Sequence, residues 1–111
     1  MPKLSLLLEN PHYELLTNKH GDPYFEGIYA TDLLSTAIKH MKPDMALITL
    51  ISTNSTINLA MMLDFHVIIL TKDASVSEDF IQKAITEELT IIKTDYLTHE
   101  VIIDMMMRSL I

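Results

Sequence analysis

The chain has 111 residues, 49% of them apolar, and a net charge of −7 from eight basic and fifteen acidic residues. This length suits one domain over residues 1–111 with a single core, and the scattered basic residues argue against binding to nucleic acid or to an anionic membrane surface. The apolar runs are far shorter than the ~20 residues of a membrane-spanning helix, which excludes membrane spans. The absence of cysteine excludes disulfides, thiol catalysis and thiolate metal sites. Both observations favour a cytoplasmic protein.

The amino-terminal segment predicts short elements separated by turn signals. The first ten residues are expected to form a short helix that ends at Asn10-Pro11, because proline disfavours helix in the preceding residue. Residues 13–17 and 25–29 are predicted to be strands, and residues 18–23 contain the Gly, Asp and Pro typical of a turn.

A longer helix is predicted next. Thr31 or Asp32 can cap it through a side-chain oxygen, and Lys42-Pro43-Asp44 ends it after about Met41. Its apolar residues recur at helical spacing and form one stripe. They are Leu33, Leu34, Ala37, Ile38 and Met41.

Three short β-branched runs follow, at residues 46–51, 67–70 and 90–92. Each ends in a small polar cluster and is followed by a helix-length amphipathic segment. Continuous apolar runs are typical of strands buried on both faces, and helical crossovers join such strands in parallel. The pattern predicts an α/β fold of three layers, α/β/α, with a mostly parallel central sheet. It leaves the strand order open.

The helices after these runs have candidate N-caps. Asn54 or Ser55 is expected to cap the first, and residues 75–78, Ser-Val-Ser-Glu, offer a capping box for the second. Thr98 is expected to cap a final helix that ends near Leu110.

The segment from Gly27 to Ser35, and the chain after it, resemble the small DRTGG domain family. Its Gly-x-x-x-Thr-Asp-Leu-Leu-Ser helix entry is followed by a strand and a Ser/Thr-rich turn over Thr49 to Ile57. The turn that names the family corresponds to Thr71-Lys72-Asp73, and the last strand runs into Thr-x-x-Leu-Thr-x-Glu over residues 94–100. The order and spacing of these motifs indicate a stand-alone member of the family.

The resemblance implies a regulatory α/β/α module that tends to self-associate. Relatives occur beside CBS domains in inorganic pyrophosphatases, and the fold is similar to the amino-terminal domain of HPr kinase/phosphorylase. Two departures from the family pattern stand out. The paired glycines of the turn are Lys72 and Asp73 here, and the glycine before the last strand is replaced within Glu87-Glu88-Leu89.

Polar residues follow three predicted strands, where ligands settle in parallel α/β sheets. A small anionic metabolite there would meet hydroxyl groups, the Asn54 amide, helix-start amides and Lys72 as counter-charge. The alternative is that such residues only cap helices. The candidate ligand residues are Ser52, Thr53, Asn54, Ser55, Thr71, Lys72, Asp73 and Thr94.

Neither metal binding nor catalysis is indicated. Two glycines are too few for a phosphate-binding glycine-rich loop, and no nucleophile and base can be assembled from neighbouring residues. We expect no cofactor, no metal and no enzymatic activity. Five histidines lie on different predicted elements without metal-ligand spacing: His12, His20, His40, His66 and His99.

The last predicted helix has more apolar residues than one face can hold. At 3.6 residues per turn, Ile103 and Met107 do not share the stripe of Ile102, Met105 and Met106. The surplus is explained by a homodimer interface, to which methionine adapts well, or by burial within the monomer. The candidate interface residues are Met61, Ile102, Ile103, Met106 and Met107.

These observations favour a non-catalytic regulatory or interaction module that forms a homodimer and can bind a protein partner. The alternative is a sensor of a nucleotide or phosphorylated metabolite at the carboxyl ends of the strands. A kinase similar to the HPr kinase relatives is a third class, which the missing P-loop disfavours.

Overall fold

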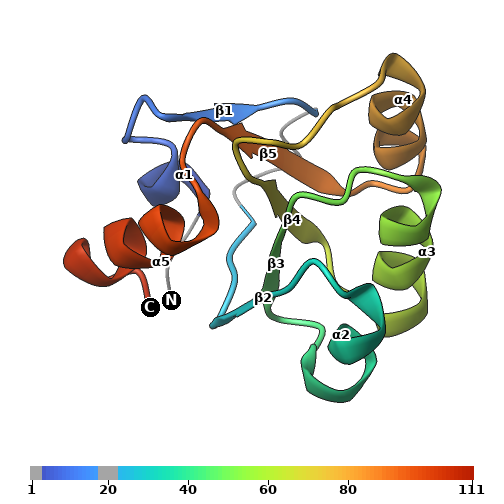
Figure 1. The fold of residues 1–111 in the computed structure, drawn as a ribbon, viewed down its shortest axis with the longest axis horizontal. Coiled ribbons are helices and arrows are strands. Elements are labelled where there is room, and N and C mark those ends of the chain that lie inside the picture. Colours follow the sequence, from blue (N-terminus) through green and yellow to red (C-terminus); the bar gives the residue numbers. More distant parts are fainter. Residues whose placement is uncertain (1–3, 18–22) are drawn as a thin grey trace.

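The computed structural model describes residues 4–17 and 23–111. The predicted turn at residues 18–23, apart from Pro23, lies outside the described residues. The elements are α1 (Leu4–Leu7), β1 (Tyr13–Leu15), β2 (Ile28–Ala30), α2 (Leu34–His40), β3 (Ala46–Thr49), α3 (Asn54–Leu63), β4 (Val67–Leu70), α4 (Glu78–Thr86), β5 (Thr90–Thr94) and α5 (Thr98–Met107) (Figure 1).

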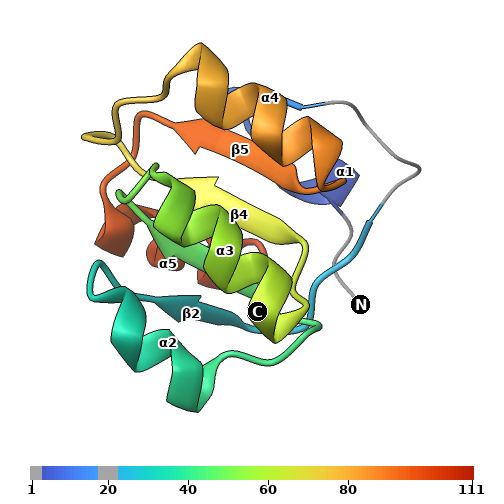
Figure 2. The ribbon, with the colours of Figure 1, turned by 90° about the vertical axis from the view of Figure 1, so that its right-hand side faces the viewer.

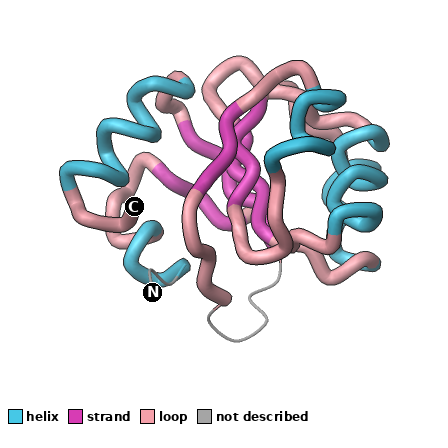
Figure 3. The backbone as a smooth tube through the Cα atoms, turned by 90° about the horizontal axis from the view of Figure 1, so that it is seen from below, coloured by secondary structure: helices cyan, strands magenta, loops and turns pink. Residues whose placement is uncertain are grey.

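The strands form one sheet in the order β1-β5-β4-β3-β2. β2, β3, β4 and β5 are parallel, and β1 joins the β5 edge in the antiparallel direction. Helices lie on both sides of the sheet, which is plain when the molecule is seen from below (Figure 3). The predicted three-layer α/β/α fold with a mostly parallel sheet is confirmed.

The strand order decides which helices cover each face. Because β2 to β5 are neighbours in sequence order, right-handed crossovers place α2, α3 and α4 on the same face (Figure 2). The opposite face is covered by α1 and α5, which come from the two ends of the chain (Figure 1).

Successive residues of the central strands point into two different cores. Leu47, Ile68 and Ile91 belong to the core beneath α2, α3 and α4, and Ile48 and Ile69 belong to the core beneath α1 and α5. These strands are apolar throughout because both faces of the sheet are buried, as the sequence predicted.

β2 begins later than predicted. The sequence favoured a strand over residues 25–29, but Gly27 has a φ of +79°, a left-handed conformation that does not continue a strand. Phe25 lies before this bend and is buried in the core beneath α1 and α5. The ordered strand starts only at Ile28.

The stripe predicted for α2 is partly wrong. Ala37 and Met41 are buried as expected and Leu34 is partly buried, but the side chains of Leu33 and Ile38 are exposed. α2 follows the edge strand β2 and packs on α3, so only its inner side meets the sheet. Its remaining apolar residues face outward.

Candidate functional site

The carboxyl ends of the four parallel strands lie at one edge of the sheet (Figure 2). The loop after β3 holds Ser52 and Thr53, residues 54–55 begin α3, residues 71–73 follow β4, and Thr94 ends β5. The structure therefore brings the predicted ligand residues to this edge, although they come from three separate segments.

Hydrogen bonds within the chain join two of these segments to their neighbours. The backbone N–H of Thr71 donates to the carbonyl of Thr49 at 3.1 Å, and that of Lys72 donates to the carbonyl of Tyr96 at 2.9 Å. The Thr94 hydroxyl accepts the backbone N–H of Tyr96 at 3.1 Å. Because the side chains of Thr71 and Thr94 are also buried, these two residues stabilise the loops at this edge.

A lysine that the sequence analysis did not select lies at the same edge. The Lys93 ammonium donates to the carbonyls of Lys72 at 3.2 Å and of Thr94 at 3.0 Å. Nearby, the Ser52 hydroxyl donates to the carbonyl of Ser75, which ties the loop after β3 to the loop after β4. Lys93 directly follows the predicted run 90–92 but lies within β5, and only the pairing of β4 with β5 reveals that its side chain reaches this edge.

The Asp32 carboxylate lies at the end of β3 and binds the chain there. One carboxylate oxygen accepts the backbone N–H of Leu50 at 2.8 Å and the Thr49 hydroxyl at 3.0 Å. The sequence proposed Asp32 as a helix cap, but α2 starts from Leu33 without a side-chain cap. Because Asp32 binds Leu50, the strand predicted over residues 46–51 ends at Thr49.

Asn54 and Ser55 do not cap α3, since its N-cap is Thr53 and no side-chain bond is made there. Asn54 instead accepts a hydrogen bond from the Lys83 ammonium of α4 at 3.1 Å and lines a cavity of about 380 Å³ between α3 and α4. Ser55 lines a different cavity, of about 280 Å³, between α2 and α3. These two predicted ligand residues therefore line separate cavities.

The two glycine substitutions noted in the family pattern have different structural consequences. Lys72 and Asp73 form a turn closed by a bond from the Ala74 N–H to the Thr71 carbonyl at 3.0 Å, and neither residue has a positive φ. Glu88 does have a positive φ, of 58°. The backbone therefore tolerates the change in the turn but is strained at Glu88, where glycine fits better.

α5 carries an exposed apolar stripe, which we call the α5 surface: Ile103, Met106 and Met107. Their exposed fractions are 55%, 63% and 82%, and they lie at i, i+3 and i+4 on one side of the helix. The residues that face the sheet are Val101 and Met105, both fully buried. The sequence placed Met106 in the same stripe as Met105. In the structure only Met105 is buried, so this grouping is wrong.

The predicted interface residues do not form one continuous surface. Ile102 is partly buried against the core beneath α1 and α5, and of the apolar residues of that helix only Ile103, Met106 and Met107 are widely exposed. Met61 lies on α3, across the sheet from α5 (Figure 1). With its exposed neighbour Met62 it belongs to a second apolar area.

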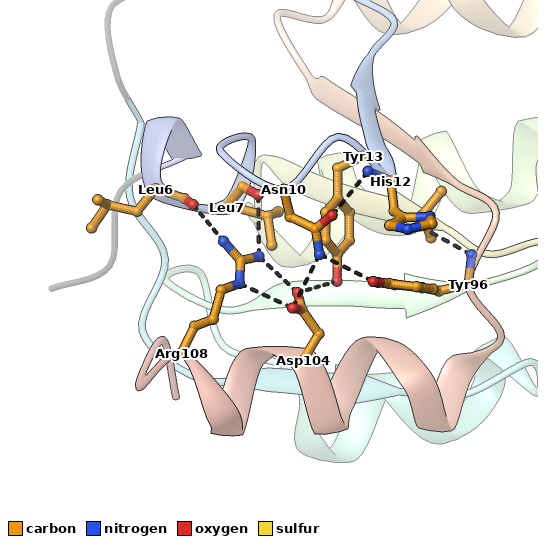
Figure 4. Close-up of polar contacts among 9 residues, drawn as sticks. Leu6, Leu7, Asn10, His12, Tyr13, Tyr96, Asp104 and Arg108 are labelled. Atoms are coloured by element: carbon orange, nitrogen blue, oxygen red, sulfur yellow. Dashed lines mark hydrogen bonds and ion pairs between the residues drawn. The ribbon is translucent and has the colours of Figure 1, made fainter.

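A polar cluster joins α5 to the amino-terminal segment (Figure 4). The Asp104 carboxylate accepts hydrogen bonds from Asn10 at 3.1 Å, from the Tyr13 hydroxyl at 2.8 Å and from Arg108 at 2.7 Å. Arg108 also donates to the carbonyl of Leu6 at 2.8 Å. Sequence reasoning missed this cluster, because its contacts join residues up to 102 positions apart in the chain.

The cluster shifts the pKa of its members. Burial raises the pKa of Asp104, but the hydrogen bonds from Arg108, Tyr13 and Asn10 outweigh burial, so the pKa lies below its usual value. The hydrogen bond to Asp104 raises the pKa of Arg108. Burial, and then the bond to Asp104, raises the pKa of Tyr13. At neutral pH the cluster is a charged pair with a neutral tyrosine, which suits a structural role.

His12 and Asp95 form a separate contact beside this cluster. The His12 Nδ1 atom lies 2.8 Å from the Asp95 carboxylate, and the ring of His12 stacks on that of Tyr96 with centroids 4.5 Å apart. The hydrogen bond from His12 holds the pKa of Asp95 below its usual value. Both side chains are about half exposed or more, so the pair adds little to stability.

The amino ends of the strands hold a cavity that the sequence did not indicate. Its volume is about 420 Å³, and its lining includes Tyr24, Asp44, Asp64, His66 and Glu88. His66 lies 3.5 Å from Asp64, and its side chain is exposed rather than part of the core. Within residues 4–17 and 23–111, no three histidine, aspartate or glutamate side chains gather closely enough to hold a metal ion, and His20 lies outside these ranges.

No helix among the described residues is both long and apolar enough to cross a membrane.

Comparison with known proteins gives a family match and a similarity to solved structures. Residues 19–108 match the DRTGG domain family. A similar structure is that of the CBS and DRTGG domains of the regulatory region of Clostridium perfringens pyrophosphatase, complexed with the activator diadenosine tetraphosphate. It shares 13% identity and a TM-score of 0.69 over 90% of this chain, which spans 44% of that one. No curated protein matches the chain.

The family match begins after β1, so α1 and β1 lie before the matched segment. The rest of the fold lies almost wholly within it, as the spacing of the sequence motifs suggested. Because the match extends over most of the chain, the protein belongs to the DRTGG domain family.

Proposed function

We propose that the protein is a non-catalytic regulatory module that acts as a homodimer, with the α5 surface at the centre of the interface. The observation that carries this proposal is the exposure of Ile103, Met106 and Met107 on one side of α5. Three adjacent apolar side chains of this size are the kind of patch that interfaces use. The regulatory role is supported by the similar DRTGG domain, which belongs to the regulatory region of a pyrophosphatase.

We take a second copy of the chain as the partner, and the charges indicate where two copies can meet. The net charge of −7 makes two copies repel each other, so they approach most easily where their surfaces are uncharged. Of the charges of α5, Asp104 and Arg108 neutralise each other at 2.7 Å. The exposed Glu100 carboxylate, which accepts the Leu97 N–H, adds a negative charge beside Ile103. Two α5 helices packed around a two-fold axis would place the same apolar residues against each other.

Neighbouring features give such an interface more area than one stripe supplies. A groove of about 450 Å³ runs beside the stripe and is lined by Tyr96, His99, Ile103 and Met107, among others. Standard interfaces bury roughly 800 Å² on each partner. Tyrosine and methionine are enriched in the centres of such interfaces.

The test compares charged substitutions on the two faces of the sheet. Met106→Glu is expected to raise the dimer dissociation constant at least about 100-fold, because it would bury an unpaired carboxylate among the apolar side chains of the interface. Met62→Glu is the matched control, since Met62 is 62% exposed and Met106 is 63% exposed. Sedimentation equilibrium measures both constants.

A monomer at tens of micromolar would refute the dimer. Dissociation by Met62→Glu with an intact Met106→Glu dimer would instead place the interface on α3.

A second candidate function is the sensing of a nucleotide or phosphorylated metabolite at the carboxyl ends of the strands. Lys72 and Lys93 at that edge support it, as does the nucleotide activator bound to the pyrophosphatase region. Asp32 argues against it, because its carboxylate already binds the Leu50 N–H. An anion would have to displace Asp32 or bind beside it.

Thermal unfolding in the presence of nucleotides tests this candidate. A ligand at 100 times its dissociation constant stabilises the folded state by about 2.7 kcal/mol. Lys72→Ala should abolish the shift, whereas Lys39→Ala, on α2 away from this edge, should not. The absence of any shift with nucleotides or sugar phosphates would remove the candidate. The cytoplasmic location and a protein partner stay predictions.

A further inference from the structure

All the sulfur of this protein is in methionine, because the chain has eight methionines and no cysteine. Three consecutive methionines on α5 differ sharply in exposure: Met105 is 0% exposed, Met106 63% and Met107 82%. Exposure decides whether an oxidant reaches a thioether. The two accessible sulfur atoms of this helix therefore lie within the α5 surface.

We propose that Met106 and Met107 form an oxidation site through which a peroxide weakens self-association. The inference rests on the dimer proposed above and adds a chemical control to it. The peroxide transfers one oxygen atom to Sδ: the O–O bond breaks, an S–O bond forms, the thioether loses two electrons, and hydrogen peroxide leaves as water.

The sulfoxide opposes dimer formation for a simple physical reason. Oxidation turns a flexible apolar side chain into one with a strong hydrogen-bond acceptor. Burial of that acceptor against Ile103 and its copy would leave it without a donor, at a cost in free energy. A two-fold axis doubles the effect, because Met106 and Met107 each occur once in each protomer.

The oxidant acts on the free protomer, in which both thioethers are exposed. Because oxidised protomers re-associate poorly, oxidation draws the population towards monomers by mass action. Methionine sulfoxide can be reduced enzymatically, so the control is reversible.

The experiment uses the full chain with Met61→Leu and Met62→Leu, which removes the exposed thioethers of α3 and leaves α5 unchanged. After treatment with hydrogen peroxide, peptide mass spectrometry locates the added oxygen, and sedimentation equilibrium gives the dimer dissociation constant. We expect oxidation of Met106 and Met107 with Met105 spared, a rise of at least about 100-fold in that constant, and recovery after treatment with methionine sulfoxide reductase.

A second variant, with Met106→Leu and Met107→Leu added, is the matched control. Leucine has nearly the same volume and cannot be oxidised this way, so this variant should stay dimeric in peroxide. Dissociation of this variant would overturn the inference, and so would an oxidised Met106 and Met107 pair that leaves the constant unchanged. A chain that is monomeric before any peroxide is added would refute the dimer itself, which separates the two failures.

Discussion

At the scale of single residues, Asp104 is the side chain on which the amino-terminal segment depends most. Its carboxylate binds Arg108, Tyr13 and Asn10, and its side chain is only 14% exposed. Loss of Asp104 removes the hydrogen bond of the Tyr13 hydroxyl and the ion pair of Arg108, whereas Asn10 keeps its bond to Tyr96, at a cost of about 1–3 kcal/mol. Asp104 is thus a structural residue in a region rich in polar contacts.

The lowered pKa of Asp104 makes its contribution depend on pH. The unfolded value is 3.8 and the folded value is lower, so the contribution is fully present above pH 3.8 and is lost as the pH falls through the folded pKa. Asp104→Asn cannot titrate at this position. We therefore expect the difference in unfolding free energy between the wild type and this variant to shrink as the pH falls below 3.8.

Urea unfolding at several pH values measures that difference. Asp95 also has a lowered pKa, but it is present in both proteins and cancels in the comparison. A difference that stays constant across this range would show that the lowered pKa of Asp104 is wrong.

At the scale of elements, the sequence predicts the buried strands well and the helix starts less well. β4 has the predicted bounds, because a continuous apolar run between polar residues has only one possible placement. Helix caps depend on which of several adjacent polar residues turns inward. The box over residues 75–78 predicts Ser75 as the cap of α4, but the cap is Ser77, which accepts the N–H of Phe80 at 3.1 Å. α3 and α5 begin from Thr53 and Leu97 rather than from the predicted Asn54, Ser55 or Thr98 caps.

The sequence predicts that α5 has exposed apolar residues, but it does not predict which ones they are. Periodicity shows that an eleven-residue apolar segment exceeds one face, but it does not say which face meets the sheet. That choice is made by Val101 and Met105, which pack into the core shared with Leu4 and Leu7 of α1. A contact between the two ends of a chain has no local signal in sequence.

The end of α4 offers a prediction at this scale. Glu88 has a φ of 58°, which costs a residue with a side chain roughly 1–2 kcal/mol. Glycine avoids that cost but loses more entropy on folding, about 0.5–1 kcal/mol. Glu88→Gly is therefore expected to stabilise the protein by up to about 1 kcal/mol in chemical unfolding.

Glu87→Gly is the matched control for this substitution. Glu87 precedes Glu88 directly, but its φ is −89°, a conformation open to every residue. Glycine there brings only the entropic loss and should destabilise the protein by about 0.5–1 kcal/mol. If both variants lost stability equally, the left-handed conformation of Glu88 would carry no strain.

At the scale of the whole molecule, the sheet has one face covered by three crossover helices and one covered only by elements from the chain ends. The order β5-β4-β3-β2 follows the sequence, so every crossover falls on the same side. The second face depends on α5 and on α1, and α1 lies outside the family match. Exposed apolar residues nevertheless occur on both faces, with Met61 and Met62 on α3 and the α5 surface on the other side, so the covering of the sheet does not by itself select the interface.

The net charge of −7 gives the two proposed functions opposite responses to salt. Two acidic copies that meet through apolar side chains repel each other at long range, and salt screens that repulsion, with a Debye length of about 30 Å at 0.01 M and about 10 Å at 0.1 M. The dimer should therefore become tighter over this range. Binding of a phosphorylated ligand to Lys72 and Lys93 should become weaker, because salt screens attraction as well. Sedimentation equilibrium and calorimetric titration at the two salt concentrations measure these trends, and a dimer that weakens with added salt would mean that ion pairs rather than the α5 surface hold it together.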